Sequence, residues 1–313
     1  MLNRRHIRIK VMQSIYVMHQ QQSDQLDKEE KFLFQSIENT QDLYLLLLSA
    51  LVETKKKEEL YIDIASKKHL ATKEERNPSL KFVHNRVLMA LSSSKALEQA
   101  LKERKINNWQ QNDDIILYLI ESIKDSKLYQ NYMKVPTSSF EEDRNFLAEL
   151  HTEIISPSEK LYDYLEDHKL TWLDDLPGIN TLILKQIKQL KSETDSLIIP
   201  EVYKDDDDKE FVTNLFRKTV LNEVELSKEY IDKTPNWDVD RIAEIDTIIL
   251  KMAICELLKF PSIPTKVTIN EYLEIAKEYS TPKSSIFING ILDNLVKEFE
   301  KDKRLTKSGR GLL

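Results

Sequence analysis

Residues 241–257, with the sequence RIAEIDTIILKMAICEL, show most clearly which secondary structure this chain forms. Apolar side chains recur there at helical spacing, for example at Ile248, Met252 and Cys255, and the same spacing returns through most of the chain. Few segments alternate between apolar and polar residues as strands do. The sequence therefore predicts an all-α fold, with helices of about 10–20 residues that end at Pro-containing breaks.

Residues 146–251 show the pattern of an internal repeat. An offset of 65 residues places Phe146, Leu150, Leu161 and Trp172 onto Phe211, Leu215, Leu226 and Trp237. One residue later, INTLILK at 179–185 corresponds to IDTIILK at 245–251. Two of the three tryptophans pair in register, which favours duplication of a helical unit over chance similarity between amphipathic helices.

The composition excludes several classes of site. The 313-residue chain has four glycines, and none of them forms a glycine-rich loop for nucleotide phosphates. Its six histidines lack metal-binding spacing, and its one cysteine, Cys255, falls in an apolar helical row and is predicted to be buried. We therefore expect no cofactor and no metal, and the protein is predicted not to be an enzyme.

The amino-terminal residues carry no pattern typical of export or of membrane insertion. Arg4, Arg5 and Arg8 are not followed by the apolar run of a signal peptide. The longest aliphatic stretch, residues 43–51, is about half the length that spans a bilayer. We therefore expect a cytoplasmic protein.

Charge is distributed unevenly along the chain. The net charge is −7, yet residues 1–22 and 301–313 each carry +4, so the remainder carries −15. Because neutralisation of phosphates drives nucleic-acid binding, this acidic remainder would oppose general binding of nucleic acid. Any nucleic-acid site must then be local.

The amino-terminal segment breaks a local rule of helices. Acidic residues are preferred in the first turn of a helix, yet the opening helix begins with Arg4, Arg5, Arg8 and Lys10. With Tyr16 nearby, these cations could clamp phosphates and stack a base. The alternative is ordinary scattered surface charge, and the residues alone leave both interpretations open.

Gly290 is a second residue whose type does not suit its predicted place in a helix. It lies in a helix that the sequence begins at Thr281 and Pro282. Gly costs about 1 kcal/mol relative to Ala inside a helix, so its presence indicates that a neighbour approaches closely. Packing against another helix is the favoured explanation, with Phe287 and Asn289 as lesser candidates for contact with a ligand.

Four motifs in sequence carry a family resemblance. They are residues 241–257, IPTKVTINE at 263–271, EIAK at 274–277 and FINGILD at 287–293. In order, spacing and residue type they resemble the NusB family of bacterial transcription antitermination factors. The opening segment RRHIRIKVMQSIY, at 4–16, also looks like the arginine-rich first helix of that family.

The resemblance implies an all-helical, non-enzymatic adaptor made of packed helical bundles. NusB pairs with NusE, a small-subunit ribosomal protein, and the pair holds boxA RNA so that RNA polymerase resists termination, notably during transcription of ribosomal RNA. Carried over by position, the implied RNA contacts are Arg4, Arg5, Arg8, Lys10, Tyr16, Phe287 and Asn289. Asp246 and Glu256 are the implied partner contacts, while Lys266 and Asn270 match motif positions without a defined role.

The chain is longer than typical members of the family, and the resemblance implies a division into four parts. These are an opening helix at 1–24, a helical insertion with NusB-like repeats at 25–205, a NusB-like carboxy-terminal part at 206–302 and a basic tail at 303–313 that we expect to be disordered. A helical scaffold that binds only proteins and has lost RNA binding is the alternative function. Both a monomer and a homodimer remain open.

Overall fold

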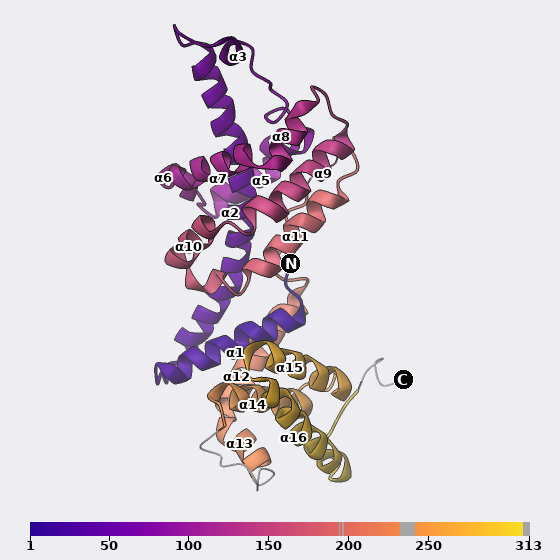
Figure 1. Cartoon of the computed structure of the whole chain (residues 1–313). Helices are drawn as coiled ribbons and strands as arrows, with labels where there is room; N and C mark the ends of the chain where they lie inside the picture. The colour runs from indigo at the N-terminus through magenta and orange to yellow at the C-terminus, as the bar shows by residue number, and fades with distance from the viewer. Residues whose placement is uncertain (194, 196, 232–241, 309–313) are drawn as a thin grey trace. The chain divides into compact units, whose positions relative to one another are not determined.

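The computed structural model describes residues 1–193, 195, 197–231 and 242–308. Within these residues every regular element is a helix, as Figure 1 shows, so the prediction of an all-α fold is confirmed. The chain divides into two compact units. Unit 1 comprises residues 1–37 and the described residues from 202 onward, and unit 2 comprises residues 38–201.

Unit 1 is organised around a central helix, α14. Its helices are α1 (Arg4–Gln20), the first part of α2 (Leu26–Ser66), α12 (Asp206–Leu221), α13 (Glu223–Ile231), α14 (Glu244–Lys259), α15 (Thr265–Tyr279) and α16 (Pro282–Lys301). Helix α14 packs against α1, α12, α13, α15 and α16. It can do so because its buried residues surround the helix instead of forming one stripe, which is typical of a helix at the centre of a core.

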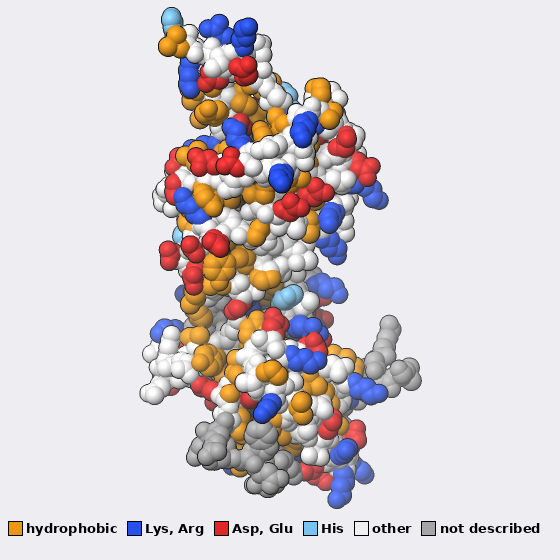
Figure 2. Space-filling view, viewed as in Figure 1, with side chains coloured by type: hydrophobic (Ala, Val, Ile, Leu, Met, Phe, Trp, Pro, Cys, Tyr) orange, Lys and Arg blue, Asp and Glu red, His pale blue; other side chains and the backbone are white. Residues whose placement is uncertain are grey.

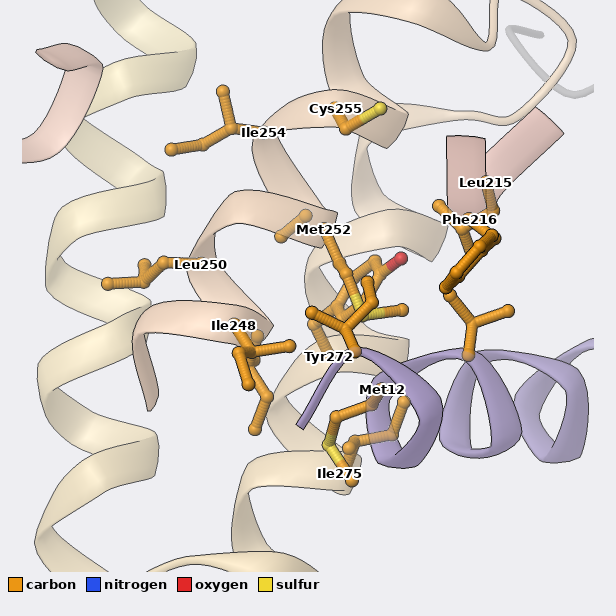
Figure 3. Packing of buried hydrophobic residues seen from close by; sticks show 14 of the residues in the cluster. Met12, Leu215, Phe216, Ile248, Leu250, Met252, Ile254, Cys255, Tyr272 and Ile275 are labelled. Carbon is orange, nitrogen blue, oxygen red and sulfur yellow. The ribbon is translucent and has the colours of Figure 1, made fainter. Parts of the chain in front are cut away.

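Figure 3 shows how side chains gather around α14. Met252 lies with Met12 of α1 and Tyr272 of α15, whereas Leu250 and Ile254 point to the other side of α14. All five side chains are at most 1% exposed. The helix that carries the arginine cluster is therefore held directly against the centre of the unit.

Cys255 lies in the same core. Its thiol is buried, as the sequence predicts, and burial raises its pKa to about 11. A thiol with a raised pKa is a poor nucleophile, so its role is packing.

The structure confirms the start of α16 but not the explanation offered for Gly290. Thr281 is the N-cap residue and Pro282 occupies the first turn. A Cβ atom added to Gly290 would meet no heavy atom of the described residues within 4 Å. Close packing of another helix therefore does not account for this glycine.

Helix α2 is much longer than the helices that the sequence predicts. It runs for 41 residues because the segment contains neither Pro nor Gly. Leu33 and Ile37 join the core of unit 1, which is why this unit extends past residue 24. No described helix is long and apolar enough to cross a membrane.

Unit 2 contains the rest of α2 and a set of shorter helices. They are α3 (Lys73–Arg76), α4 (Arg86–Ser92), α5 (Lys95–Glu103), α6 (Asn108–Gln111), α7 (Asp113–Asp125), α8 (Lys127–Lys134), α9 (Phe140–Leu150), the π-helix η1 (His151–Ile155), α10 (Glu159–His168), the 3-10 helix η2 (Leu170–Trp172) and α11 (Leu176–Gln189). Two tryptophans attach this set to α2. The indole Nε1 of Trp109 donates to the carbonyl of Leu46 at 3.1 Å, and that of Trp172 donates to the carbonyl of Asn39 at 2.7 Å.

The predicted repeat falls on helices that correspond in order. Its first copy lies on α9, α10 and α11, and its second on α12, α13 and α14. In each set the first helix packs against the third. Trp237, the second tryptophan of the alignment, and Arg241 lie outside the described residues.

The described part of the basic tail contacts other helices of unit 1. Arg304 forms an ion pair with Glu229, and the Lys307 ammonium donates to the carbonyls of Glu256 and Phe260 at 3.1 and 3.0 Å. These carbonyls belong to the last turn of α14 and its C-cap, where they also accept the backbone N–H groups of Phe260 and Ile263. Arg304 thus contacts α13, and Lys307 contacts the end of α14.

Candidate nucleic-acid interface

A hollow of about 530 Å³ lies where α1 and α15 begin. Its walls include Arg4, Arg5 and Arg8 of α1, the segment 262–264, and Val267 and Glu271 of α15. The first turn of neither helix contains an acidic residue. The Asn3 side chain caps the start of α1 by accepting the His6 N–H, whereas no described side chain caps α15. The partial positive charge of the two helix amino termini supplements the arginines, and this combination favours an anion. We call this site the first hollow.

Arg4 stands at the rim of the first hollow. Its side chain is 41% exposed, and its Nε donates to the Asp208 carboxylate at 3.0 Å. Its guanidinium also lies over the Phe211 ring, 5.1 Å from the ring centroid. These contacts orient the guanidinium while leaving a large part of it open to solvent.

Arg5 forms a two-point ion pair across the first hollow. Its Nε and Nη2 donate to the two carboxylate oxygens of Glu271 at 2.8 and 2.9 Å. Arg5 is 41% exposed and Glu271 is 21% exposed. The hydrogen bond from Arg5 lowers the pKa of Glu271, and the same contact raises the pKa of Arg5.

Arg8 is buried in the interior of unit 1, and this corrects the expectation that it contacts RNA. Its Nε and Nη2 each donate to Glu256 at 2.8 Å, and the two side chains are only 2% and 0% exposed. The hydroxyls of Thr268 and Tyr272 donate to the same carboxylate at 2.8 and 3.3 Å. Glu256 is likewise removed from the partner surface, because a fully buried carboxylate cannot reach another protein.

Lys10 and Tyr16 do not join the two exposed arginines. Lys10 is only 3% exposed, so it is removed from the candidate RNA contacts. Tyr16 is 38% exposed, but it lies 11 residues after Arg5 on α1, roughly 16 Å along the helix axis. The structure therefore brings Arg4 and Arg5 together at the first hollow and separates Tyr16 from them.

Phe287 lines a second hollow, of about 190 Å³, with Asp246, Ser284 and Lys283. Asp246 is 5% exposed, and its Oδ2 accepts a hydrogen bond from the Ser284 hydroxyl at 2.7 Å. Its Oδ1 is buried and has no hydrogen-bond partner among the described residues. Since a buried carboxylate oxygen is costly to leave unpaired, this hollow suits a cation or an N–H donor from outside.

The remaining predicted residues lie on the surfaces of α15 and α16. Asn289 is partly exposed and donates to Asp293 at 3.3 Å. Lys266 and Asn270 are exposed on α15. None of the three is among the residues that line either hollow.

Sequence reasoning did not identify the acids that pair with the arginines. Glu271 ends the motif at 263–271, and Asp208 belongs to the aspartate run in the first turn of α12, but neither position signals an arginine partner. The residues involved are more than 200 positions apart in the chain. Figure 2 shows the same intermixing of Lys and Arg with Asp and Glu over the visible face of unit 1.

Comparison with known proteins finds a family similarity over most of the carboxy-terminal part of the chain. Residues 179–297 match the model of the NusB family. The transcription antitermination protein NusB of Salinibacter ruber is 46% identical over 106 residues, which are 34% of this chain and 66% of that protein. The NusB proteins of Chloroherpeton thalassium and Natranaerobius thermophilus are 42% and 50% identical, over 37% and 23% of this chain and 56% and 53% of their own lengths.

The matched region defines how far the similarity extends. The chain spans between about half and two thirds of the length of these relatives. The match to the family model begins within α11 and does not include α1. No solved structure matches the chain.

Proposed function

We propose, from the premise that the carboxy-terminal part of this chain belongs to the NusB family, that the protein is a transcription antitermination factor. In this proposal it binds boxA-type RNA together with the ribosomal protein NusE and couples both to RNA polymerase. It acts as a binding protein and not as an enzyme. The relatives named above support the antitermination role, and the geometry of the two hollows supports the division of binding between RNA and protein.

The first hollow is the RNA-binding site in this proposal. Arg4 and Arg5 are exposed guanidinium groups beside two helix amino termini, and both features favour phosphate oxygens. The exposed side chain of Val267 adds an apolar wall against which a base or ribose can pack. RNA therefore contacts Arg4 and Arg5 directly, whereas Arg8 shapes the floor of the hollow from below.

Titration with a labelled boxA RNA, at about 150 mM salt and with and without purified NusE, tests this assignment. Arg4→Gln together with Arg5→Gln is expected to weaken binding of boxA RNA at least about tenfold, because each lost phosphate contact removes a charge-assisted hydrogen bond. Arg217→Gln is the matched control, since Arg217 is a comparably exposed arginine that pairs with Asp27 and Glu30. The helical signal in circular dichroism checks that each variant is folded.

The two possible results separate the candidate functions. Binding that prefers boxA to a scrambled RNA, is strengthened by NusE and is lost in the double variant supports the antitermination adaptor. Equal, weak binding to both RNAs would instead favour a scaffold that binds only proteins. The observation in favour of that alternative is that Arg4, Arg5 and Arg8 each already have a carboxylate partner within the chain.

The second hollow is the site at which NusE binds in this proposal. The unpaired Oδ1 of Asp246 is placed to accept an N–H donor from a basic protein such as NusE. Asp246→Asn keeps the shape of the side chain but removes its charge, and it is expected to weaken binding of NusE about tenfold or more. Calorimetry measures this, with Glu300→Gln, an exposed change at the far end of α16, as the control. An unchanged dissociation constant for Asp246→Asn would remove this surface from the proposal.

A further inference from the structure

We propose that Glu271 competes with RNA for Arg5 and so determines how strongly the first hollow binds a phosphodiester chain. The inference rests on the proposed function, because it concerns the same hollow. The carboxylate of Glu271 occupies both Nε and Nη2 of Arg5, at 2.8 and 2.9 Å. These are the two parallel N–H donors that a phosphate group would use, so RNA must displace Glu271 before it engages Arg5 in this way.

The three arginine pairs at the hollow differ in how easily they open. Glu256 accepts from four side-chain donors in a fully buried setting, so its pair with Arg8 is permanent. Within the described part of the chain, Arg4 donates to Asp208 through its Nε only. The outer N–H groups of Arg4 can therefore meet a phosphate without breaking this contact. Only the pair of Arg5 and Glu271 is both complete and partly exposed.

The surroundings of Glu271 make an exchange of partners feasible. Its Oε2 lies 3.9 Å from Nη1 of Arg8. The Glu271 carboxylate therefore still has the Arg8 guanidinium nearby when a phosphate binds Arg5. Its 21% exposure allows water to solvate the carboxylate during the exchange. Glu274 and Glu278 follow on the same helix, but they act on Arg5 only through space and accept no hydrogen bond from it among the described contacts.

The competition has a consequence for selectivity among anions. A single small anion gains one contact and must displace a bidentate carboxylate, whereas an RNA chain can hold Arg4 with one phosphate and approach Arg5 with the next. Contacts with phosphates carry no sequence information directly. Glu271 therefore lowers the affinity for all RNAs by one common factor and leaves the preference for boxA to other residues.

Glu271→Gln tests the inference, because it removes the competing charge and keeps the length of the side chain. We expect it to raise affinity for boxA RNA and for scrambled RNA alike by about threefold, the size of effect that a partly exposed ion pair produces. Glu274→Gln is the matched control: it removes the same charge one turn along α15, where Glu274 pairs with Lys277 and not with Arg5. The control is expected to change either affinity less than about 1.5-fold.

A double variant isolates the role of Arg5. In an Arg5→Gln background the competing pair no longer exists, so adding Glu271→Gln should give no threefold gain. Should Glu271→Gln fold poorly, Glu271→Asp keeps the charge on a shorter side chain that cannot reach both donors, and it should give a smaller gain of the same sign.

The results distinguish failure of this inference from failure of the proposed function. If changing Arg4 and Arg5 abolishes RNA binding but Glu271→Gln gives no gain, or no more than Glu274→Gln, Glu271 is only a structural partner and the inference is overturned. The same holds if the gain persists without Arg5. If the arginine changes leave RNA binding intact, the proposed function fails and the inference fails with it.

Discussion

Individual residues of the arginine cluster turn out to have different roles. The sequence presents Arg4, Arg5 and Arg8 as one group, and their shared position at the start of a helix was predictable. Their separate partners were not, because Arg8 meets Glu256 at a separation of 248 residues. A buried pair of this kind stabilises only while both members are present, so removing either would leave an uncompensated charge in the core.

A pH-dependent contact at the other end of α1 can be tested at the residue scale. His19 lies between two carboxylates, 2.8 Å from Glu223 and 3.1 Å from Glu244. The hydrogen bond to Glu223 is the main cause that raises the pKa of His19 above its ordinary value of 6.5. Because the folded protein holds this proton more tightly than the unfolded chain, the stabilisation is fully present below pH 6.5 and is lost as pH rises through the higher, folded-state pKa.

We therefore expect His19→Gln to lower the free energy of unfolding most at pH 6 or below, and progressively less towards pH 9. Urea titrations of wild type and variant across this range measure the difference. A difference that stays constant with pH would mean that the charge of His19 does not contribute to stability.

At the scale of the helix, Gly290 offers a test that separates packing from ligand contact. Gly290 is exposed on α16, and an added Cβ atom would meet no described heavy atom within 4 Å. Gly290→Ala is therefore expected to stabilise the protein by about 0.5–1 kcal/mol, because alanine restricts the unfolded chain and favours the helix. Thermal or urea unfolding measures this gain.

The affinity for RNA completes the test of Gly290. If binding of boxA RNA falls in Gly290→Ala while the fold becomes more stable, the glycine is there so that RNA can approach the helix near Phe287 and Asn289. If both stability and affinity are unchanged or improved, the glycine has no role in binding. A loss of stability would contradict the open space that the structure shows around this residue.

The helices also show which part of the internal repeat has a structural counterpart. Two sets of three helices follow one another in the same order, and equivalent positions such as Leu150 and Leu215 are both buried. Apolar spacing was enough to predict these helices, because each one buries a face with a regular period. The length of α2 was not predicted correctly, since the estimate came from typical helices and not from its own lack of Pro and Gly.

At the scale of the whole molecule, the pairing of charges limits how strongly salt affects RNA binding. Only two arginines of the cluster, Arg4 and Arg5, are exposed at the first hollow. For single-stranded RNA each phosphate contact contributes roughly −0.7 to the slope of log K against log salt, so we expect a slope of about −1.4 from these two. Titrations between about 50 and 200 mM salt measure it, and the double glutamine variant should give a slope close to zero. A much steeper slope would mean that other basic residues contact RNA.

The all-helical class, the start of α16, the buried cysteine and the clustering of arginines in the opening helix could be predicted from the chain alone, because they depend on residues that are neighbours in sequence. The burial of Arg8, Lys10 and Glu256 became evident only once the helices were packed, as did the pairing of Glu271 with Arg5 and the Asp246 oxygen that has no partner among the described residues. Burial and ion pairing depend on which distant segments pack together. Helical periodicity shows which face of a helix is apolar, but not which charged side chain of another helix will lie opposite it.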